Sequence, residues 1–127
     1  MSREKTKQLH KSVAPYTKAN NKKSIIQLCN TLLPLILFWA LSFISLQISV
    51  WLTILFSIIG SAFIVRTFII FHDCTHGSFF NHKKSNDTIG TITGILTLFP
   101  YEKWKREHAI HHASSSNLDK RGIGDIW

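Results

Sequence analysis

Residues 24–65 read SIIQLCNTLLPLILFWALSFISLQISVWLTILFSIIGSAFIV and contain no charged side chain. A helix needs roughly 20 apolar residues to cross a hydrocarbon core about 30 Å thick, so this stretch has room for two crossings. We place them at about Ile25–Ser45 and Val50–Phe71, because residues 45–49 are the most polar part of the interior. The stretch therefore predicts an all-α membrane protein built on a two-helix transmembrane hairpin.

A basic leader precedes the hairpin. Seven of the first 23 residues are Lys or Arg, and only Glu4 is acidic. Because Lys and Arg stay on the cytoplasmic side, the leader predicts a cytoplasmic amino terminus, and two crossings return the chain to that face at His72. The apolar stretch is far longer than the core of a secretory signal, so we expect a retained anchor. We divide the chain into a leader over 1–24 and one domain over 25–127.

The formal net charge of +8 points to a negatively charged partner. The basic residues stand at the ends of apolar segments without a nucleic-acid-binding signature, so we expect anionic lipid and no nucleic acid. Cys29 lies at the start of the apolar region and Cys74 lies among histidines, which is not the pattern of a disulfide framework. We expect two free thiols in a reducing cytosol.

A third apolar run covers Thr88–Phe99 and holds two glycines and four threonines. As a helix it would be only about 18 Å long, too short to cross the bilayer. We expect a short interfacial or re-entrant helix that returns to the cytoplasmic face, followed by cytoplasmic histidine-bearing helices.

Two histidine clusters carry the candidate chemistry. His72 and His76 stand four residues apart at the end of the second predicted crossing, and His108, His111 and His112 follow downstream. Residues three and four apart share a helix face, so each cluster presents its imidazoles together. The expected topology puts both clusters on one membrane face, where they can converge. Imidazole ligands without clustered thiolates suit iron, zinc, copper or nickel rather than a structural zinc module.

The other histidines are interpreted as surface residues. His82 stands beside Lys83 and Lys84 and is off the register of the first cluster, and His10 lies in the leader. The residues alone leave two non-enzymatic alternatives open, a membrane protein with a bis-histidine haem and a nickel or zinc store. A visible-region spectrum would separate haem from non-haem iron.

The sequence around both clusters resembles one family. Residues 72–80, HDCTHGSFF, look like the first histidine box of the membrane-bound acyl-lipid desaturases, and residues 108–112, HAIHH, look like the second. In that family a Pro-Tyr pair and a Trp precede the second box, and here Pro100-Tyr101 and Trp104 stand in the same order. The similarity is to bacterial members that act on membrane phospholipid acyl chains.

The resemblance implies a fatty-acid desaturase, an oxidoreductase of the bacterial cytoplasmic membrane. Such an enzyme uses two non-haem iron ions, O2 and an electron donor of the ferredoxin, flavodoxin or cytochrome b5 type to introduce a cis double bond into membrane-lipid acyl chains. It also implies that Asp73 and Asp125 are candidates to orient an imidazole N–H. The iron ligands that it implies are His72, His76, His108, His111 and His112.

The resemblance also marks what these 127 residues do not contain. In the family the chain continues through further spanning helices to a third histidine box. We therefore expect an N-terminal fragment, an incomplete domain that inserts into a membrane but does not desaturate lipid by itself. A hydroxylase or ketolase of the same superfamily would share the boxes, although the residues around them favour a desaturase.

Overall fold

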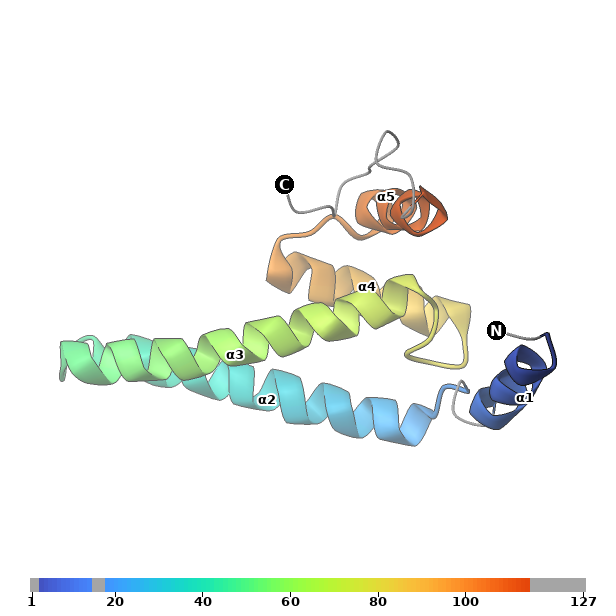
Figure 1. Ribbon diagram of the computed structural model, residues 1–127. Helices are drawn as coiled ribbons and strands as arrows, with labels where there is room; N and C mark the ends of the chain where they lie inside the picture. The colour runs from blue at the N-terminus through green and yellow to red at the C-terminus, as the bar shows by residue number, and fades with distance from the viewer. Residues whose placement is uncertain (1–2, 15–17, 115–127) are drawn as a thin grey trace.

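The computed structural model describes residues 3–14 and 18–114, and these residues form helices and no β-strand. In Figure 1, α2 and α3 run side by side as a long hairpin, α4 lies along the final part of α3, and α5 packs beyond α4. The predicted all-α fold, with two long apolar helices, is confirmed. The helices are α1 Arg3–Val13, α2 Asn21–Ser45, α3 Val50–Thr75, α4 Lys83–Thr97 and α5 Tyr101–Ser114.

The α2–α3 hairpin presents an apolar outer surface. The two helices have 25 and 26 residues, and both are long and apolar enough to cross a membrane. Large apolar side chains face outward along them, with Phe43 75% and Trp51 77% exposed. Such a surface is a liability in water but matches lipid tails. Near the turn, the hydroxyls of Ser45 and Thr53 lie 3.0 Å apart and link the two helices.

Both hairpin helices extend past the boundaries predicted from hydropathy. Helix α2 begins four residues before Ile25, because the side chain of Asn20 accepts a hydrogen bond from the Lys23 amide at 3.1 Å and caps the first turn. Helix α3 continues four residues past Phe71. Hydropathy marks where lipid contact ends, whereas a helix ends where its backbone hydrogen bonds are capped, so the two boundaries differ.

The end of α3 is fixed by a glycine. Gly77 has a φ of +67°, in the left-handed region that suits glycine. Its amide donates to the Cys74 carbonyl at 3.0 Å, and the Ser78 amide donates to the Asp73 carbonyl at 3.1 Å. These two bonds form a Schellman motif, which stops the helix immediately after His76.

The loop between α3 and α4 is held from both sides. The side-chain carbonyl of Asn86, which is 2% exposed, accepts from the Phe80 amide at 2.9 Å, and its NH2 group donates to the Phe80 carbonyl at 2.8 Å. On the α2 side, the Ser24 hydroxyl donates to the Phe79 carbonyl, and the Asn81 amide donates to the Asn21 side chain at 3.0 Å. The loop therefore fixes α4 relative to both hairpin helices.

The third apolar run forms α4, which begins five residues before the predicted Thr88. Its first turn is polar, with Lys83 and Lys84 exposed, so hydropathy could not reveal it. At about 1.5 Å per residue, its 15 residues span about 22 Å, less than the hydrocarbon core. Helix α4 is thus too short to cross, while its interfacial or re-entrant location remains a prediction.

Two glycines let α4 approach its neighbours closely. A Cβ on Gly90 would lie 2.1 Å from the ring of Tyr101. A Cβ on Gly94 would lie 2.6 Å from the Phe99 carbonyl oxygen and 3.1 Å from the ring of Phe71. The glycines of this run therefore serve packing between α3, α4 and the start of α5.

The buried core lies at the α4 and α5 end of the hairpin. It combines the last turns of α3 with the loop after it and the first turn of α5, so it supports the end of α3 that carries His72 and the turn of α5 that precedes His108. The core residues are Ile70, Phe71, Cys74, Phe79, Phe80, Tyr101 and Trp104.

Cys29 and Cys74 are both free, so neither forms a disulfide, as predicted.

Candidate metal centre

The first histidine pair lies where α3 ends. His72 is in the last turn and His76 is the C-cap, and their Nε2 atoms are 3.2 Å apart. The Thr75 hydroxyl donates to the His72 carbonyl at 2.6 Å, which helps to satisfy the end of the helix. His72 is partly buried and His76 is exposed, so the pair opens from the core toward solvent.

The second pair comes from α5 and meets the first. His108 and His112 are one turn apart, with their Nε2 atoms separated by 3.0 Å. The Nε2 atom of His108 also lies 3.0 Å from that of His72 and 3.1 Å from that of His76. Two histidine pairs that are more than 30 residues apart in sequence thus direct four imidazoles toward one another, as predicted for the two clusters.

Trp104 holds His108 in place. The indole stacks on the His108 ring with centroids 4.1 Å apart and an angle of 22°, and its edge meets the His72 ring at 5.8 Å. The same indole packs against Phe71 of the core at 5.0 Å. Aromatic contacts of this kind restrict ring orientation, so Trp104 connects the packing of the core to the geometry of both pairs.

The distances between the four nitrogens fit one metal ion. Two imidazole nitrogens that are each about 2.0–2.1 Å from the same ion lie about 3.0 Å apart at a right angle and about 3.4 Å apart at a tetrahedral angle. The four shortest contacts, 3.0–3.2 Å, fit this range. The four ligand atoms span up to 4.8 Å, so a ring must rotate slightly to bring every pair within the about 4.2 Å that two nitrogens on one ion can span. The residues present therefore suit a single transition-metal ion.

Hydrogen bonding alone cannot account for this arrangement. The Nε2 atoms of His72, His76 and His108 form a triangle in which every side is 3.0–3.2 Å. In a neutral imidazole each nitrogen is either a donor or an acceptor, so at least two of the three must have the same role. One side of the triangle is then repulsive, and a shared cation removes that repulsion.

The third histidine of the second cluster lies beside the four. The His111 ring stacks near His108, with centroids 5.8 Å apart, but His111 is not part of the four-nitrogen group. Asp73 lies next to His72, with its Oδ1 3.4 Å from the ring Nδ1. That distance is long for a hydrogen bond, so the roles of His111 as a ligand and Asp73 as an orienting group remain predictions.

The remaining residues singled out in the sequence either lie away from the four-histidine group or lie outside the described residues. His82 is exposed and precedes the first turn of α4, where it contributes no nitrogen to the four-histidine group. Asp125 lies outside the described residues, as does the side chain of His10.

The environment keeps the rings of His76 and His108 neutral. Burial and then the surrounding imidazoles lower the pKa of His108 to about 4. Burial, followed by His72 and His112, also lowers the pKa of His76. A neutral ring offers the lone pair that a metal requires, so at pH 7 these side chains are ready to bind a cation.

A pocket of about 470 Å³ opens beside the four histidines. It is lined on one side by the end of α3 and on the other by α5, and the ammonium-bearing side chain of Lys105 forms part of its wall. The pocket therefore gives access to the centre between α3 and α5. The lining residues are Thr75, His76, Lys105, His108, Ala109 and His112.

Sequence reasoning missed a polar network next to the centre. Oδ1 of Asp87 on α4 accepts hydrogen bonds from the Tyr101 hydroxyl at 3.1 Å and from Lys105 Nζ at 2.6 Å. The Tyr101 hydroxyl also lies 3.0 Å from the carbonyl oxygen of Cys74 on α3. The one available signal was the position of Asp87 just ahead of an apolar run, where an unpaired carboxylate would be costly.

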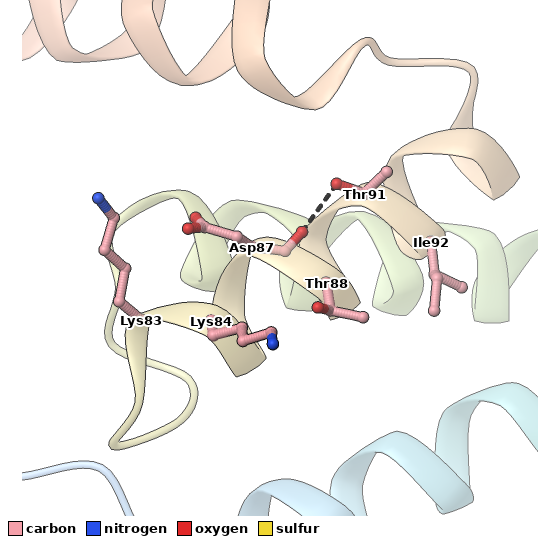
Figure 2. Close-up of a pocket in the computed structure, with 6 residues that line it drawn as sticks. All are labelled: Lys83, Lys84, Asp87, Thr88, Thr91 and Ile92. Atoms are coloured by element: carbon pink, nitrogen blue, oxygen red, sulfur yellow. Dashed lines mark hydrogen bonds between the residues drawn. The ribbon is translucent and has the colours of Figure 1, made fainter.

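A separate hollow lies on the outer face of α4 (Figure 2). Figure 2 shows the side chains of Lys83, Lys84 and Asp87 along this face, and Thr91 donating to the Asp87 carbonyl. The hollow is formed by one helix alone and its carboxylate is already paired with Lys105. It has none of the converging groups that the histidine centre has.

Comparison with known proteins identifies the family of this chain. Residues 48–125 match the model of the fatty acid desaturase family. The chain is 53% identical over 123 residues, 97% of its length, to a fatty acid desaturase of Bacillus subtilis (strain 168). The chain therefore belongs to the fatty acid desaturase family.

Shorter segments of the chain match other fatty acid desaturases at lower identity. An omega-3 fatty acid desaturase of Caenorhabditis elegans is 40% identical over 60 residues, 47% of this chain and 15% of that protein. An sn-1 acyl-lipid omega-3 desaturase (ferredoxin) of Synechocystis is 42% identical over 52 residues, 41% of this chain and 14% of that protein. The chain spans 35% of the Bacillus relative's length. No solved structure matches it.

Proposed function

We propose that this chain forms part of the iron centre of an acyl-lipid desaturase, which introduces a cis double bond into membrane-lipid acyl chains using O2 and reducing equivalents. The observation that carries the proposal is the convergence of two histidine pairs from α3 and α5 on one ion-sized position. Membership of the fatty acid desaturase family supplies the reaction class.

The residues of the chain bind and orient in this proposal. His72, His76, His108 and His112 would hold one iron, and His111 would contribute to a second that needs further ligands. Iron held by these residues would supply the power to oxidise an unactivated C–H bond, which protein side chains lack. Trp104 and Phe71 pack behind the rings and keep water from that side of the centre.

The location of the centre suits its proposed substrates. It stands at the end of an apolar hairpin, where a lipid acyl chain from the bilayer and a reductant from the aqueous phase can both reach it. We propose membrane phospholipid acyl chains, O2 and an electron donor of the ferredoxin, flavodoxin or cytochrome b5 type as partners. The Synechocystis relative is named an sn-1 acyl-lipid omega-3 desaturase (ferredoxin), and this name supports the acyl-lipid substrate and the ferredoxin donor.

A chimera tests the proposed function directly. The part of the Bacillus desaturase that matches this chain would be replaced by the 127 residues, and the fatty acids of the host would be analysed by gas chromatography of their methyl esters. The chimera is expected to form a new unsaturated species. The 127 residues expressed alone are expected to form none, because the four converging histidines hold a single ion.

The chimera result can fail in two informative ways. A chimera that inserts and binds iron but forms no double bond would contradict the desaturase assignment. A new unsaturated species made by the 127 residues alone, and lost with His108→Ala, would show that no further ligands are needed.

We further propose that the protein is a multi-pass protein of the bacterial cytoplasmic membrane, with the amino terminus and both histidine clusters in the cytoplasm. Single cysteines at Ser12, Gln47 and Ala113, in a background with Cys29→Ala and Cys74→Ala, test this topology. An impermeant thiol reagent added to intact cells is expected to label only the cysteine in the hairpin turn, at position 47. Strong labelling at position 113 would contradict the proposed orientation.

A further inference from the structure

One stripe of α5 carries both polar anchors and metal ligands. Tyr101, Lys105, His108 and His112 follow at intervals of four, three and four residues, so they lie along the same side of the helix. A slip of one residue would rotate this stripe by about 100° and move it by about 1.5 Å. Whatever fixes Tyr101 and Lys105 therefore also fixes the two histidines.

The anchors of that stripe join three helices at a single point. The Tyr101 hydroxyl contacts the carbonyl of Cys74, which lies midway between His72 and His76 on α3. Asp87 of α4 accepts from both Tyr101 and Lys105 through one oxygen. The network thus connects the segment that carries one histidine pair to the stripe that carries the other.

The packing around Tyr101 leaves it little freedom. The residue is 4% exposed, and its ring occupies the space that a side chain on Gly90 would need. The ring also meets Phe71 edge-on, with centroids 6.0 Å apart. Steric contacts hold the ring in place. The contacts of the hydroxyl then fix the position of α5 along its own axis.

From this geometry we propose that Asp87, Tyr101 and Lys105 are positioning residues, which set the register of α5 against α3 and thereby the spacing between the two histidine pairs. The proposal rests on the proposed metal-binding function of those pairs. None of the three side chains is assigned a contact with the metal.

The charge states of the network are consistent with this role. The hydrogen bond from Lys105 lowers the pKa of Asp87, and the same bond raises the pKa of Lys105. Both groups are therefore charged at pH 7, and their hydrogen bond is charge-assisted. Burial raises the pKa of Tyr101 to about 12, so the phenol stays protonated and remains a donor.

Co²⁺ titration of the detergent-solubilised chain, followed by its visible absorption bands, measures the effect. Tyr101→Phe and Asp87→Asn are each expected to weaken Co²⁺ binding by about tenfold and to shift the bands, as changes to residues supporting metal ligands do. Lys105→Met should behave in the same way, whereas Lys105→Arg keeps the donor and should restore both affinity and spectrum. Glu102→Gln, an exposed carboxylate on α5, is the matched control and should match the unmodified chain.

The variants separate position from charge. Asp87→Asn uncovers the cation of Lys105, which could repel Co²⁺ directly, but Tyr101→Phe changes no charge. If Asp87→Asn weakens binding while Tyr101→Phe does not, the effect is electrostatic and the positioning role is wrong. Unmodified affinity and spectrum in both variants would overturn it as well.

Hydrogen exchange of the metal-free chain separates this inference from the proposed function. The α5 amides are expected to exchange several-fold faster in Tyr101→Phe and Asp87→Asn than in Glu102→Gln, while the α3 amides keep their rates. If the unmodified chain binds no Co²⁺, the proposed metal site fails, and the exchange rates alone then decide whether the network positions α5. Equal rates in all variants would refute it.

Discussion

In the Bacillus chimera, His72→Ala is expected to reduce double-bond formation below detection while membrane insertion stays intact. The Nε2 atom of His72 lies 3.0 Å from that of His108 and 3.2 Å from that of His76, so its loss removes a contact to both histidine pairs. The three nitrogens that remain bind metal more weakly. The apolar spans of α2 and α3 are untouched, so insertion should not change.

The matched control is His82→Ala, the same substitution ten residues further along. His82 is exposed and is not one of the four converging histidines, so its loss should leave most of the product. His111→Ala is expected to be as damaging as His72→Ala, because we assign His111 to the second iron. Gas chromatography of fatty-acid methyl esters measures all three. Equal damage from His82→Ala and His72→Ala would contradict the assigned ligand set.

The second large effect is expected in stability, from Asn86→Leu. The side-chain amide of Asn86 makes three hydrogen bonds to the backbone of the loop between α3 and α4. It accepts from the Phe80 N–H and donates to the carbonyls of Phe80 and His82, the latter at 3.2 Å. A leucine has a similar size but leaves the buried amide and carbonyl of Phe80 without this partner, at a cost of about 1–3 kcal/mol each. We expect a total loss on the order of 3–5 kcal/mol in the free energy of unfolding.

Thermal unfolding in detergent, monitored by circular dichroism, measures that loss. Thr88→Ala is the control, since Thr88 is an exposed residue of the same helix two positions further on. A clear fall in midpoint temperature is expected for Asn86→Leu and almost none for Thr88→Ala. If Asn86→Leu unfolds at the same temperature as the unmodified chain, the loop is not held by this side chain.

Much of the fold could be predicted because its determinants are local. The absence of charge over residues 24–65 indicates two spans, and the length of the third apolar run excludes another crossing. The spacing of His72 and His76 on one helix face requires only the period of the α-helix. The helix ends differed from prediction because capping groups such as Asn20 and Gly77, rather than hydropathy, determine them.

The contacts between helices could not be predicted in the same way. Nothing in the local pattern pairs Asp87 with Tyr101, which lies 14 residues further on, and the separation between Cys74 and Tyr101 is 27 residues. Likewise, helical spacing presents His108, His111 and His112 together, but it does not reveal which of them meet the α3 pair. The packing of Trp104 between Phe71 and His108 selects the orientation of α5 that brings His108 and His112 to His72 and His76.

The central claim is that histidines from α3 and α5 together form one metal site. X-ray absorption spectroscopy of the 127-residue chain loaded with Zn²⁺, a redox-inert stand-in for iron, tests it most directly. We predict one tightly bound ion per chain, with a first shell of four imidazole nitrogens at about 2.0–2.1 Å that loses imidazole in both His76→Ala and His112→Ala. A shell of oxygen ligands, or an imidazole shell that is unchanged in either variant, would contradict the account.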